Sequence, residues 1–412
     1  MKTGLKYLFL LCACFLINCR LGAQTPGCTD ANATNYNPAA DENDGSCLYP
    51  PTSYALNLVA DLPAAIEETS ALLSWNGVLW TINDSGHPAT LFKLDSSNGS
   101  VLTSFYLRNT ENTDWEALAQ NDSFLYIGDF GNNLGNRHDL HILKIAKAQI
   151  LSTPDDTLDA AVIQFYYPEQ TDFTPAGMNT PYDAEAFFWR NDSLHLFTKD
   201  WVANSTAHYI IPDLPGTHPA VLQETLPADG LITDAAFNPY NNNIILLGYT
   251  ETGAAFAWLL SDYQDGLFFS GNKRRIQLGS VLTTAQTEGI CFTSDYKGKI
   301  SAEAFSNETL GISVPAKLHR FDFEAFFTAA ATGIPAAAHP EKVIAAFPSP
   351  AQDFIELQLE QPAEIVIYNS GQAVVWQGKL PAGRHRVACS NWARGFYLIQ
   401  AAGSRPVKIL LQ

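Results

Sequence analysis

Five segments of this 412-residue sequence share a plan that suits a metal ion. Each begins with a small polar or acidic residue, continues as an apolar strand and a tight polar turn, and returns as a second strand. If the first strands line a common axis, their leading residues converge there, and the predicted ring is Ser70, Glu116, Glu185, Asp234 and Glu288. Burying several carboxylates as anions is costly unless a cation neutralises them, and calcium accepts six to eight oxygen ligands. Because no histidine or cysteine holds a ring position, zinc is disfavoured and we expect a central calcium ion.

Further acids are expected around this ring. One set lies two residues before it, on the same strand face because side chains alternate with a period of two, and comprises Glu68, Asp114 and Asp183. Another set ends the second strands and comprises Asp84, Asp129, Asp200 and Glu303. Since the two strands of each segment form a hairpin, both sets are expected at one mouth of the channel. The alternative is that these acids cap turns and accept hydrogen bonds from backbone amides, with no ion present.

The elements that must position these acids are short strands. Residues 51–327 contain no long amphipathic helix, and their strands are separated by Asn, Asp and Gly. Two further strands follow each pair, so each repeat has four strands. This pattern predicts an all-β fold, a five-bladed β-propeller with six blades as the alternative. The strands at residues 54–60 and 317–323 are expected to share one blade and so close the ring.

The N-terminus has the pattern of an export signal. Two lysines precede an apolar run at residues 7–17, and small residues precede Gln24, so residues 1–23 are predicted to be a signal peptide cleaved near Ala23. The run is shorter than the roughly 20 apolar residues of a membrane anchor. A lipid anchor on Cys19 is the weaker alternative, because the bulky Asn18 precedes it.

A polar loop follows at residues 24–50, and its cysteines Cys28 and Cys47 are predicted to pair. The loop resembles a short cysteine-bracketed module of surface proteins of Bacteroidota. Hard oxygen ligands beside a turn glycine, as in calcium loops, are offered by Asp41, Asn43 and Asp44. A solvated polar turn held by the disulfide is an equal alternative.

The C-terminus forms a separate region. An Ala-, Pro- and Gly-rich linker is predicted at residues 328–340, and residues 341–412 alternate strand and turn, which predicts a small antiparallel β-sandwich. This region resembles the type A sorting domain of the type IX secretion system. The similarity rests on residues 347–351, 367–369, 371–372, 395–399 and 407–409, with Ser349 in place of the usual asparagine. It implies passage through the outer membrane by the type IX machinery, removal of the domain, and release or attachment at the outer face of that membrane.

The formal net charge of −18 and a pI near 4.8 argue against nucleic acid or an anionic membrane as partner, because both require a basic surface. An acidic exported protein is better suited to cations, sugars or neutral surfaces.

The middle of the chain resembles the five-bladed propeller of calcium-dependent apyrases. The similarity is carried by residues 70–94, 115–116, 125–128 and 287–290. It implies the same calcium ring as above, with Asp234 at a position where that family has serine. Phosphate-cleaving activity does not carry over, since Asp129 lies where the family has basic residues. The remaining phosphate-binding candidates are Arg137, Lys199 and the basic run at residues 273–275.

Three functions remain from the sequence. First is a calcium-stabilised surface propeller that binds a small molecule, a glycan or a protein. Second is a calcium-dependent hydrolase of nucleotides or other phosphoesters. Third is a glycosidase that uses Asp114 with Glu116 as its acid pair and stacks a sugar on Trp115 or Trp201. The sequence contains no G-x-S-x-G elbow, H-E-x-x-H helix, Walker loop or C-x-x-C pair.

Overall fold

The computed structural model describes residues 24–153, 156–264, 266–327, 344–347, 351–359, 362–369, 373–401 and 407–411. They form two compact units on either side of residue 330, and each unit is described by itself. The predicted signal peptide at residues 1–23 and linker at residues 328–340 lie outside the described residues.

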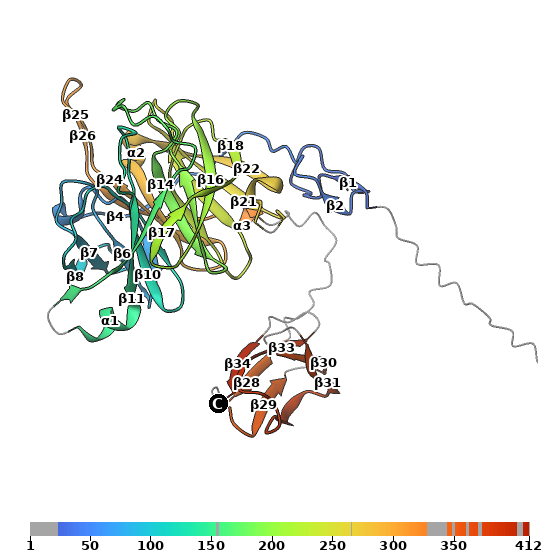
Figure 1. Ribbon diagram of the computed structural model, residues 1–412. Helices are drawn as coiled ribbons and strands as arrows, with labels where there is room; N and C mark the ends of the chain where they lie inside the picture. The colour runs from blue at the N-terminus through green and yellow to red at the C-terminus, as the bar shows by residue number, and fades with distance from the viewer. Residues whose placement is uncertain are drawn as a thin grey trace, which may run out of the picture. The chain divides into compact units, whose positions relative to one another are not determined.

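Five sheets, called blades 1 to 5, build the first unit (Figure 1). From the innermost strand outward, blade 1 comprises β5 (Leu73–Trp75), β6 (Val78–Thr81), β7 (Thr90–Leu94) and β8 (Val101–Leu107). Blade 2 comprises β9 (Trp115–Gln120), β10 (Phe124–Asp129), β11 (His141–Ala146) and β13 (Ala161–Tyr166). Blade 3 comprises β14 (Ala184–Arg190), β15 (Ser193–Thr198), β16 (Ser205–Pro212) and β18 (Val221–Pro227). Blade 4 comprises β19 (Leu231–Phe237), β20 (Ile244–Tyr249), β21 (Ala254–Ser261) and β22 (Asn272–Ser280). Blade 5 comprises β23 (Gln286–Phe292), β24 (Lys297–Glu303), β27 (Lys317–Asp322) and β4 (Asn57–Asp61).

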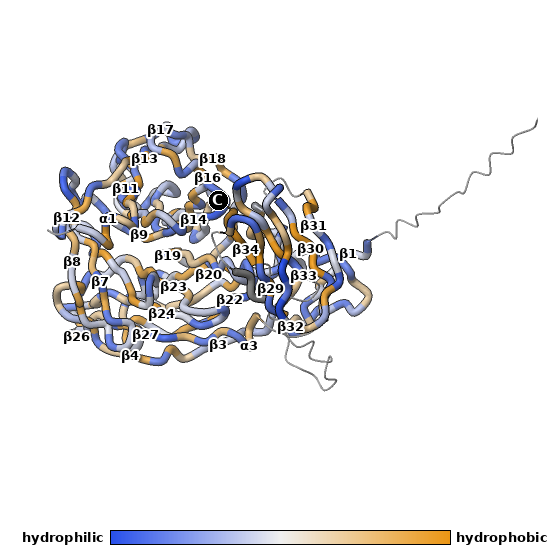
Figure 2. Tube along the Cα trace, turned by 90° about the horizontal axis from the view of Figure 1, so that it is seen from below, coloured by the Kyte–Doolittle hydropathy of each residue, from blue (hydrophilic) through white to orange (hydrophobic). Residues whose placement is uncertain are grey.

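The blades pack side by side in a ring. Apolar clusters lie between successive blades, and one of them joins blade 5 to blade 1 through Leu72, Leu79 and Cys291. Figure 2 shows β9, β14, β19 and β23 toward the middle of this unit, with β8, β17 and β4 along its periphery. Orange and blue residues alternate along many strands in that view, as expected for strands packed between neighbouring sheets. The predicted all-β propeller fold is confirmed.

The ring closes by joining the two ends of the propeller sequence. Strand β4, from the start of the chain, pairs antiparallel with β27, with Asp61 opposite Lys317 and Asn57 opposite Arg320. The prediction of a shared blade is therefore confirmed. A strand from each end removes an exposed sheet edge that would otherwise invite pairing with another chain.

Short strands cover three of the outer edges. They run parallel to the outermost strands β8, β13 and β22, and are β12 (Thr157–Leu158), β17 (Gly216–Pro219) and β3 (Thr52–Ser53). Outside the blades lie a hairpin and short helical turns, namely β25 (Phe305–Asn307), β26 (Ile312–Val314), α1 (Lys147–Ser152), α2 (Val281–Thr284), α3 (Glu324–Phe327) and 3₁₀ turns at Ala64–Ile66 and Phe268–Ser270. No helix within the described ranges is long and apolar enough to cross a membrane.

A small N-terminal module packs against blade 4. It contains β1 (Pro26–Gly27) and β2 (Glu42–Asn43), and the predicted disulfide between Cys28 and Cys47 is confirmed. Asn43 Nδ2 donates to Asn272 Oδ1 of β22 over 3.0 Å, and Lys273 Nζ donates to the carbonyl of Gly45 over 3.3 Å. The module is thus joined to the outermost strand of the blade.

The second unit is a small sandwich of two sheets. One sheet contains β28 (Ile344–Phe347), β29 (Phe354–Leu359) and β32 (Gly383–Ala388). The other contains β31 (Val374–Leu380), β30 (Ala363–Asn369), β33 (Gly395–Ala401) and β34 (Val407–Leu411). Buried residues from both sheets, including Leu357 and Ile367, form one apolar cluster. The predicted sandwich is confirmed, although residues 348–350 and 371–372 of the sorting motifs lie outside the described residues.

Candidate metal-binding mouth of the propeller

An extra residue sits at the start of each innermost strand. In blades 2, 3 and 5 the pairing with the second strand shifts by one residue, and the residue left without a partner is Glu116, Glu185 or Glu288. In blade 1, Thr69 pairs with Asn83 and Leu73 pairs with Trp80, so the first strand has one more residue between these two pairs than the second strand has. Ser70 lies in this interval, and its amide donates to the carbonyl of Ile82. Such β-bulges redirect a side chain and are frequent beside binding sites.

The fourth ring position is held by Thr233 and not by the predicted Asp234. In blade 4, Ile232 pairs with Gly248 and Asp234 with Leu247, so Thr233 is the bulged residue. The prediction is corrected by one residue, because the bulge adds a position that strand alternation in the sequence does not reveal. The hydroxyls of Ser70 and Thr233 make equivalent bonds, each to the carbonyl of the residue before the bulged glutamate of the next blade, Trp115 or Thr287.

Asp234 has a structural task one residue farther along β19. Its carboxylate accepts a hydrogen bond from the amide of Ile290 in blade 5 over 2.7 Å and another from the amide of Ala235 over 2.8 Å. Burial raises its pKa well above the ordinary value despite these bonds. The side chain therefore satisfies backbone donors of innermost strands and has little capacity left for an ion.

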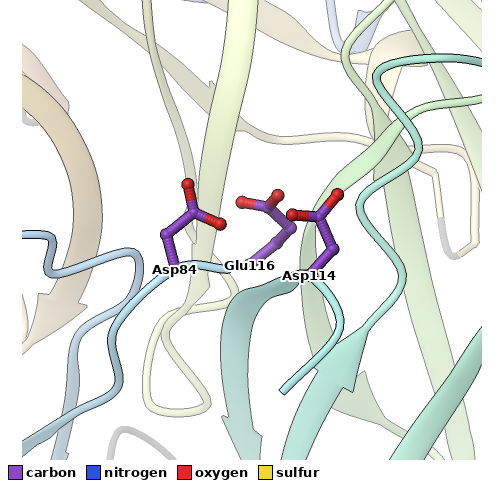
Figure 3. A group of neighbouring side chains, drawn as sticks. All are labelled: Asp84, Asp114 and Glu116. Atoms are coloured by element: carbon purple, nitrogen blue, oxygen red, sulfur yellow. The ribbon is translucent and has the colours of Figure 1, made fainter. Parts of the chain in front are cut away.

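Three carboxylates converge at the mouth where the innermost strands begin. One ligand atom from each of Asp84, Asp114 and Glu116 lies within 4.8 Å of the others, and Figure 3 shows the three side chains directed toward a common space. Asp84 comes from blade 1 and is held beside blade 2 because Asn112 Nδ2 donates to its carbonyl over 2.7 Å. In the described part of the chain, none of the three forms an ion pair with a basic side chain. We call these residues the acid trio.

Gly131 forms one wall of the acid trio. A Cβ atom at this position would lie 2.3 Å from Glu116 Oε1 and 2.4 Å from Asp114 Oδ2, closer than any real contact. Any side chain here would displace the carboxylates of Asp114 and Glu116. This residue was not among the sequence candidates, although it lies two residues after Asp129.

The electrostatics of the mouth call for positive charge. Burial, followed by repulsion from Asp84 and Asp183, raises the pKa of Asp114 to about 7. Burial and the neighbouring Glu185 raise the pKa of Glu116 well above its usual range. Protons or a bound cation must neutralise these groups near neutral pH.

Lys199, which follows β15 of blade 3, supplies one such charge. Its Nζ lies 3.1 Å from Oε1 of Glu185, and both side chains are almost fully buried. Burial alone would lower the pKa of Lys199, but carboxylates led by Glu185 outweigh it and hold that pKa well above the ordinary value. Despite this ion pair, Glu185 Oε1 accepts no hydrogen bond. The acids at this mouth therefore include Glu185, which is paired with Lys199, and the acid trio, which has no ion-pair partner among the described residues.

The remaining predicted acids serve the fold. The carboxylate of Asp129 accepts hydrogen bonds from Nη2 of Arg137 over 2.7 Å and from Nε1 of Trp115 over 3.1 Å. The carboxylate of Asp183 accepts a hydrogen bond from Nε1 of Trp201 over 2.7 Å. The others bond near neighbours, as Asp200 does with Ser205, Glu68 with His87 and Glu303 with Gln286. The alternative of bonds to backbone amides fits Asp129, Asp183 and Asp200, whereas Glu68 and Glu303 bond side chains.

The basic candidates for phosphate binding are already engaged. Arg137 pairs with Asp129 and with Asp139, and Lys199 pairs with Glu185. The run at residues 273–275 lies on β22, the outermost strand of blade 4, where its side chains donate to backbone carbonyls. Trp115, proposed to stack on a sugar, is fully buried in the apolar cluster between blades 1 and 2.

The three candidate ligands of the N-terminal loop are each bonded to a backbone amide. Asp41 Oδ1 accepts the amide of Thr25, Asn43 Oδ1 that of Gly45, and Asp44 Oδ1 that of Ser46. These bonds are those of a polar turn held by a disulfide, and a loop calcium ion stays a sequence-based prediction.

Comparison with known proteins identifies the second unit. Residues 345–409 match the family model of the secretion system C-terminal sorting domain. The predicted type IX sorting tail is confirmed, and it indicates association with that secretion system and a protein that is secreted or attached to the outer-membrane surface. No curated relative matches the sequence.

Solved structures share the general architecture at low similarity. One is PorZ, a bacterial surface component of the type IX secretion system of Porphyromonas gingivalis, with 12% identity and a TM-score of 0.32 over 84% of this chain and 45% of that chain. Another is the PQQ-bound aldose sugar dehydrogenase of Streptomyces coelicolor, with 9% identity and a TM-score of 0.41 over 66% and 100% of the two chains. Glutaminyl cyclase of Myxococcus xanthus has 11% identity and a TM-score of 0.39 over 66% and 98%. This chain spans less than half the length of the first, and none of the three assigns a function.

Proposed function

We propose that this protein is an exported β-propeller that binds a calcium ion at the acid trio and acts outside the cell as a binding module. The convergence of Asp84, Asp114 and Glu116 within 4.8 Å carries this proposal. Carboxylate oxygens are the ligands that calcium prefers, and at Gly131 the absence of a side chain leaves the oxygens of Asp114 and Glu116 uncovered.

A second observation supports an ion at this mouth. Glu185 is buried next to Glu116 and raises the pKa of Glu116, while Glu185 itself is paired with Lys199 over 3.1 Å. One lysine charge does not neutralise both carboxylates, so a cation beside Glu116 would gain from binding. The donor set contains only oxygen atoms, which suits calcium and not zinc.

The geometry gives less support to the two enzymatic alternatives. A phosphoester hydrolase needs free positive charge beside the metal, but Arg137 and Lys199 are each paired with an acid. A glycosidase needs room for a sugar between its two carboxyl groups, but the main chain of Gly131 lies against both Asp114 and Glu116. The binding role therefore agrees best with the residues at this mouth.

Thermal melting with calcium and with a chelator tests the metal site. Calcium at 100 times its dissociation constant would stabilise the protein by about 2.7 kcal/mol, which corresponds to a rise in Tm of about 5 °C. Asp114→Asn should abolish this rise. The matched control is Asp200→Asn, which removes a buried mouth acid that caps a turn and should lower Tm equally with and without calcium. A wild-type protein whose Tm is the same in calcium and in chelator would refute the site.

A further inference from the structure

A cavity of about 790 Å³ opens at the other mouth of the propeller channel. It is lined by the ends of the innermost strands of all five blades and by the turns that follow them, whereas the acid trio lies where these strands begin. The proposed calcium site makes no use of this cavity. Its volume is within the range of small-molecule binding sites.

Aromatic side chains form much of the wall. Half-buried rings reach it from different blades, namely Trp75, Phe124, Trp189, Phe237 and Phe292. Apolar side chains such as Leu118 and Ile290 lie deeper. A ligand with a flat, weakly polar ring would gain contact area against this lining.

One buried positive charge borders the cavity. Lys147 begins α1 and is 6% exposed, and its Nζ lies 2.7 Å from both Gln120 Oε1 and the carbonyl of Asn121. The Nζ is also 4.8 Å from the ring centre of Trp75. These partners are all neutral, and no carboxylate in the described residues forms an ion pair with Lys147. Burial lowers the pKa of Lys147 to about 8, so it is largely charged near neutral pH.

The other charges at the cavity are compensated or exposed. Asp213 accepts Nε1 of Trp189 and the hydroxyl of Tyr126, each over 2.8 Å, and lies 3.6 Å from Nζ of Lys144. Asp122 and Asp192 lie exposed at the rim, where water and salt screen them. Lys147 is therefore the buried charge of this lining that has no ion-pair partner among the described residues, although the negative charge of the exposed Asp122 acts on it and raises its pKa against the effect of burial.

We propose that this cavity binds a small ligand that carries a carboxylate on a six-membered ring. The carboxylate pairs with Nζ of Lys147, and the ring packs against the aromatic wall. Uronic acid sugars and aromatic carboxylic acids both have this chemistry. An ammonium–carboxylate contact in a partly desolvated site is stronger than a neutral hydrogen bond, which favours the acid over its neutral counterpart.

Calorimetric titration of the purified protein tests the proposal. The ligands are glucuronate and phenylacetate, and their neutral counterparts are glucose and 2-phenylethanol. At least one carboxylate should bind about 10-fold or more tightly than its counterpart. Binding of glucuronate alone identifies an acidic sugar, and binding of phenylacetate alone identifies an aromatic acid.

Variants locate the binding. Lys147→Met should weaken carboxylate binding by about 10-fold or more, and Lys147→Arg should retain most of it. Lys93→Met removes a lysine charge outside the cavity and should leave carboxylate binding unchanged. Failure of both carboxylates to bind, equal binding of a neutral counterpart, or unchanged binding by Lys147→Met overturns the proposal. The comparison of acid with neutral counterpart uses the wild-type protein, so it decides the matter even if a variant does not fold.

Discussion

The hydroxyl of Thr233 donates to the carbonyl of Thr287 over 2.9 Å, across the boundary between blades 4 and 5. Ser70 makes the equivalent bond to Trp115 over 2.6 Å, between blades 1 and 2. Both acceptors directly precede a bulged glutamate. Two hydroxyls therefore join neighbouring blades at the mouth and fix the backbone from which Glu116 and Glu288 project.

Thr233→Val should destabilise the propeller, because it leaves the buried carbonyl of Thr287 without this hydroxyl donor. The expected loss is about 1–3 kcal/mol in free energy of unfolding. Thr233→Ser keeps the hydroxyl and is the matched control, so it should lose less. Chemical denaturation measures both variants, and equal losses would contradict the role given to the hydroxyl.

Lys199→Met should lower the stability of the propeller and increase the stabilisation that calcium provides. It removes the cation beside Glu185 and leaves that carboxylate buried, at an expected cost of about 3–5 kcal/mol in chelator. Calcium should restore more stability to this variant than to the wild type, because more acids then lack a cation. Lys93→Met serves as the control for loss of a partly exposed lysine. If calcium stabilises Lys199→Met no more than it stabilises the wild type, then calcium and the ammonium group of Lys199 do not act on the same acids.

Gly131→Ala should abolish calcium stabilisation. Its Cβ would lie 2.3 Å from Glu116 Oε1 and would displace the acid trio. Gly177→Ala is the control, since a Cβ there meets only Leu134, at 3.8 Å. The change in Tm on adding calcium measures the effect, and a normal change in Gly131→Ala would place the ion elsewhere.

Gly45→Ala should detach the N-terminal module from blade 4. Gly45 has φ of +73°, and a Cβ would lie 2.2 Å from the carbonyl oxygen of Ser270. Hydrogen exchange should rise across residues 24–50 while the blades stay protected. A variant with unchanged exchange in this module would show that the contact tolerates a side chain.

His319 should make stability fall in mild acid. Burial lowers its pKa, with Lys317 and Asp61 as its charged neighbours, and its Nε2 lies 2.9 Å from the carbonyl of Thr284. Because the unfolded chain binds the proton more tightly, the stability from neutral His319 is full above about pH 6.5 and decreases as pH falls below it. The Tm of the wild type relative to His319→Gln should therefore drop between pH 7.5 and 5.5. Other titrating groups cancel in this difference, so a constant difference would refute the assignment.

Several features of the fold followed from local sequence. Strands were predictable where apolar and polar residues alternate between turn residues, and strands such as residues 354–359, 395–401 and 407–411 lie in the C-terminal region where alternation of strand and turn was predicted. Ring closure was predictable because one strand at each end of the propeller sequence had no partner in a complete blade. The disulfide followed from two cysteines that bracket a short polar loop.

The candidate site was predictable only in part. The sequence indicated that acids gather at one mouth, since each repeat begins and ends with a polar residue. It did not indicate that Asp84 of blade 1 joins Asp114 and Glu116 of blade 2, or that Lys199 balances Glu185. Those pairings depend on how neighbouring blades are rotated and packed, and contacts between blades leave no local pattern in the chain.

The sequence by itself determined the strand repeats, the sorting tail and the supply of carboxylates, because each depends on residue types within a short stretch. The tertiary structure decided which of those carboxylates are available to an ion. A bulge moved the fourth ring position from Asp234 to Thr233, and backbone amides occupied Asp234. The physical reason is that a carboxylate becomes a candidate ligand only where packing brings other oxygens to it and leaves it without an ion-pair partner, and both conditions depend on residues far away in the chain.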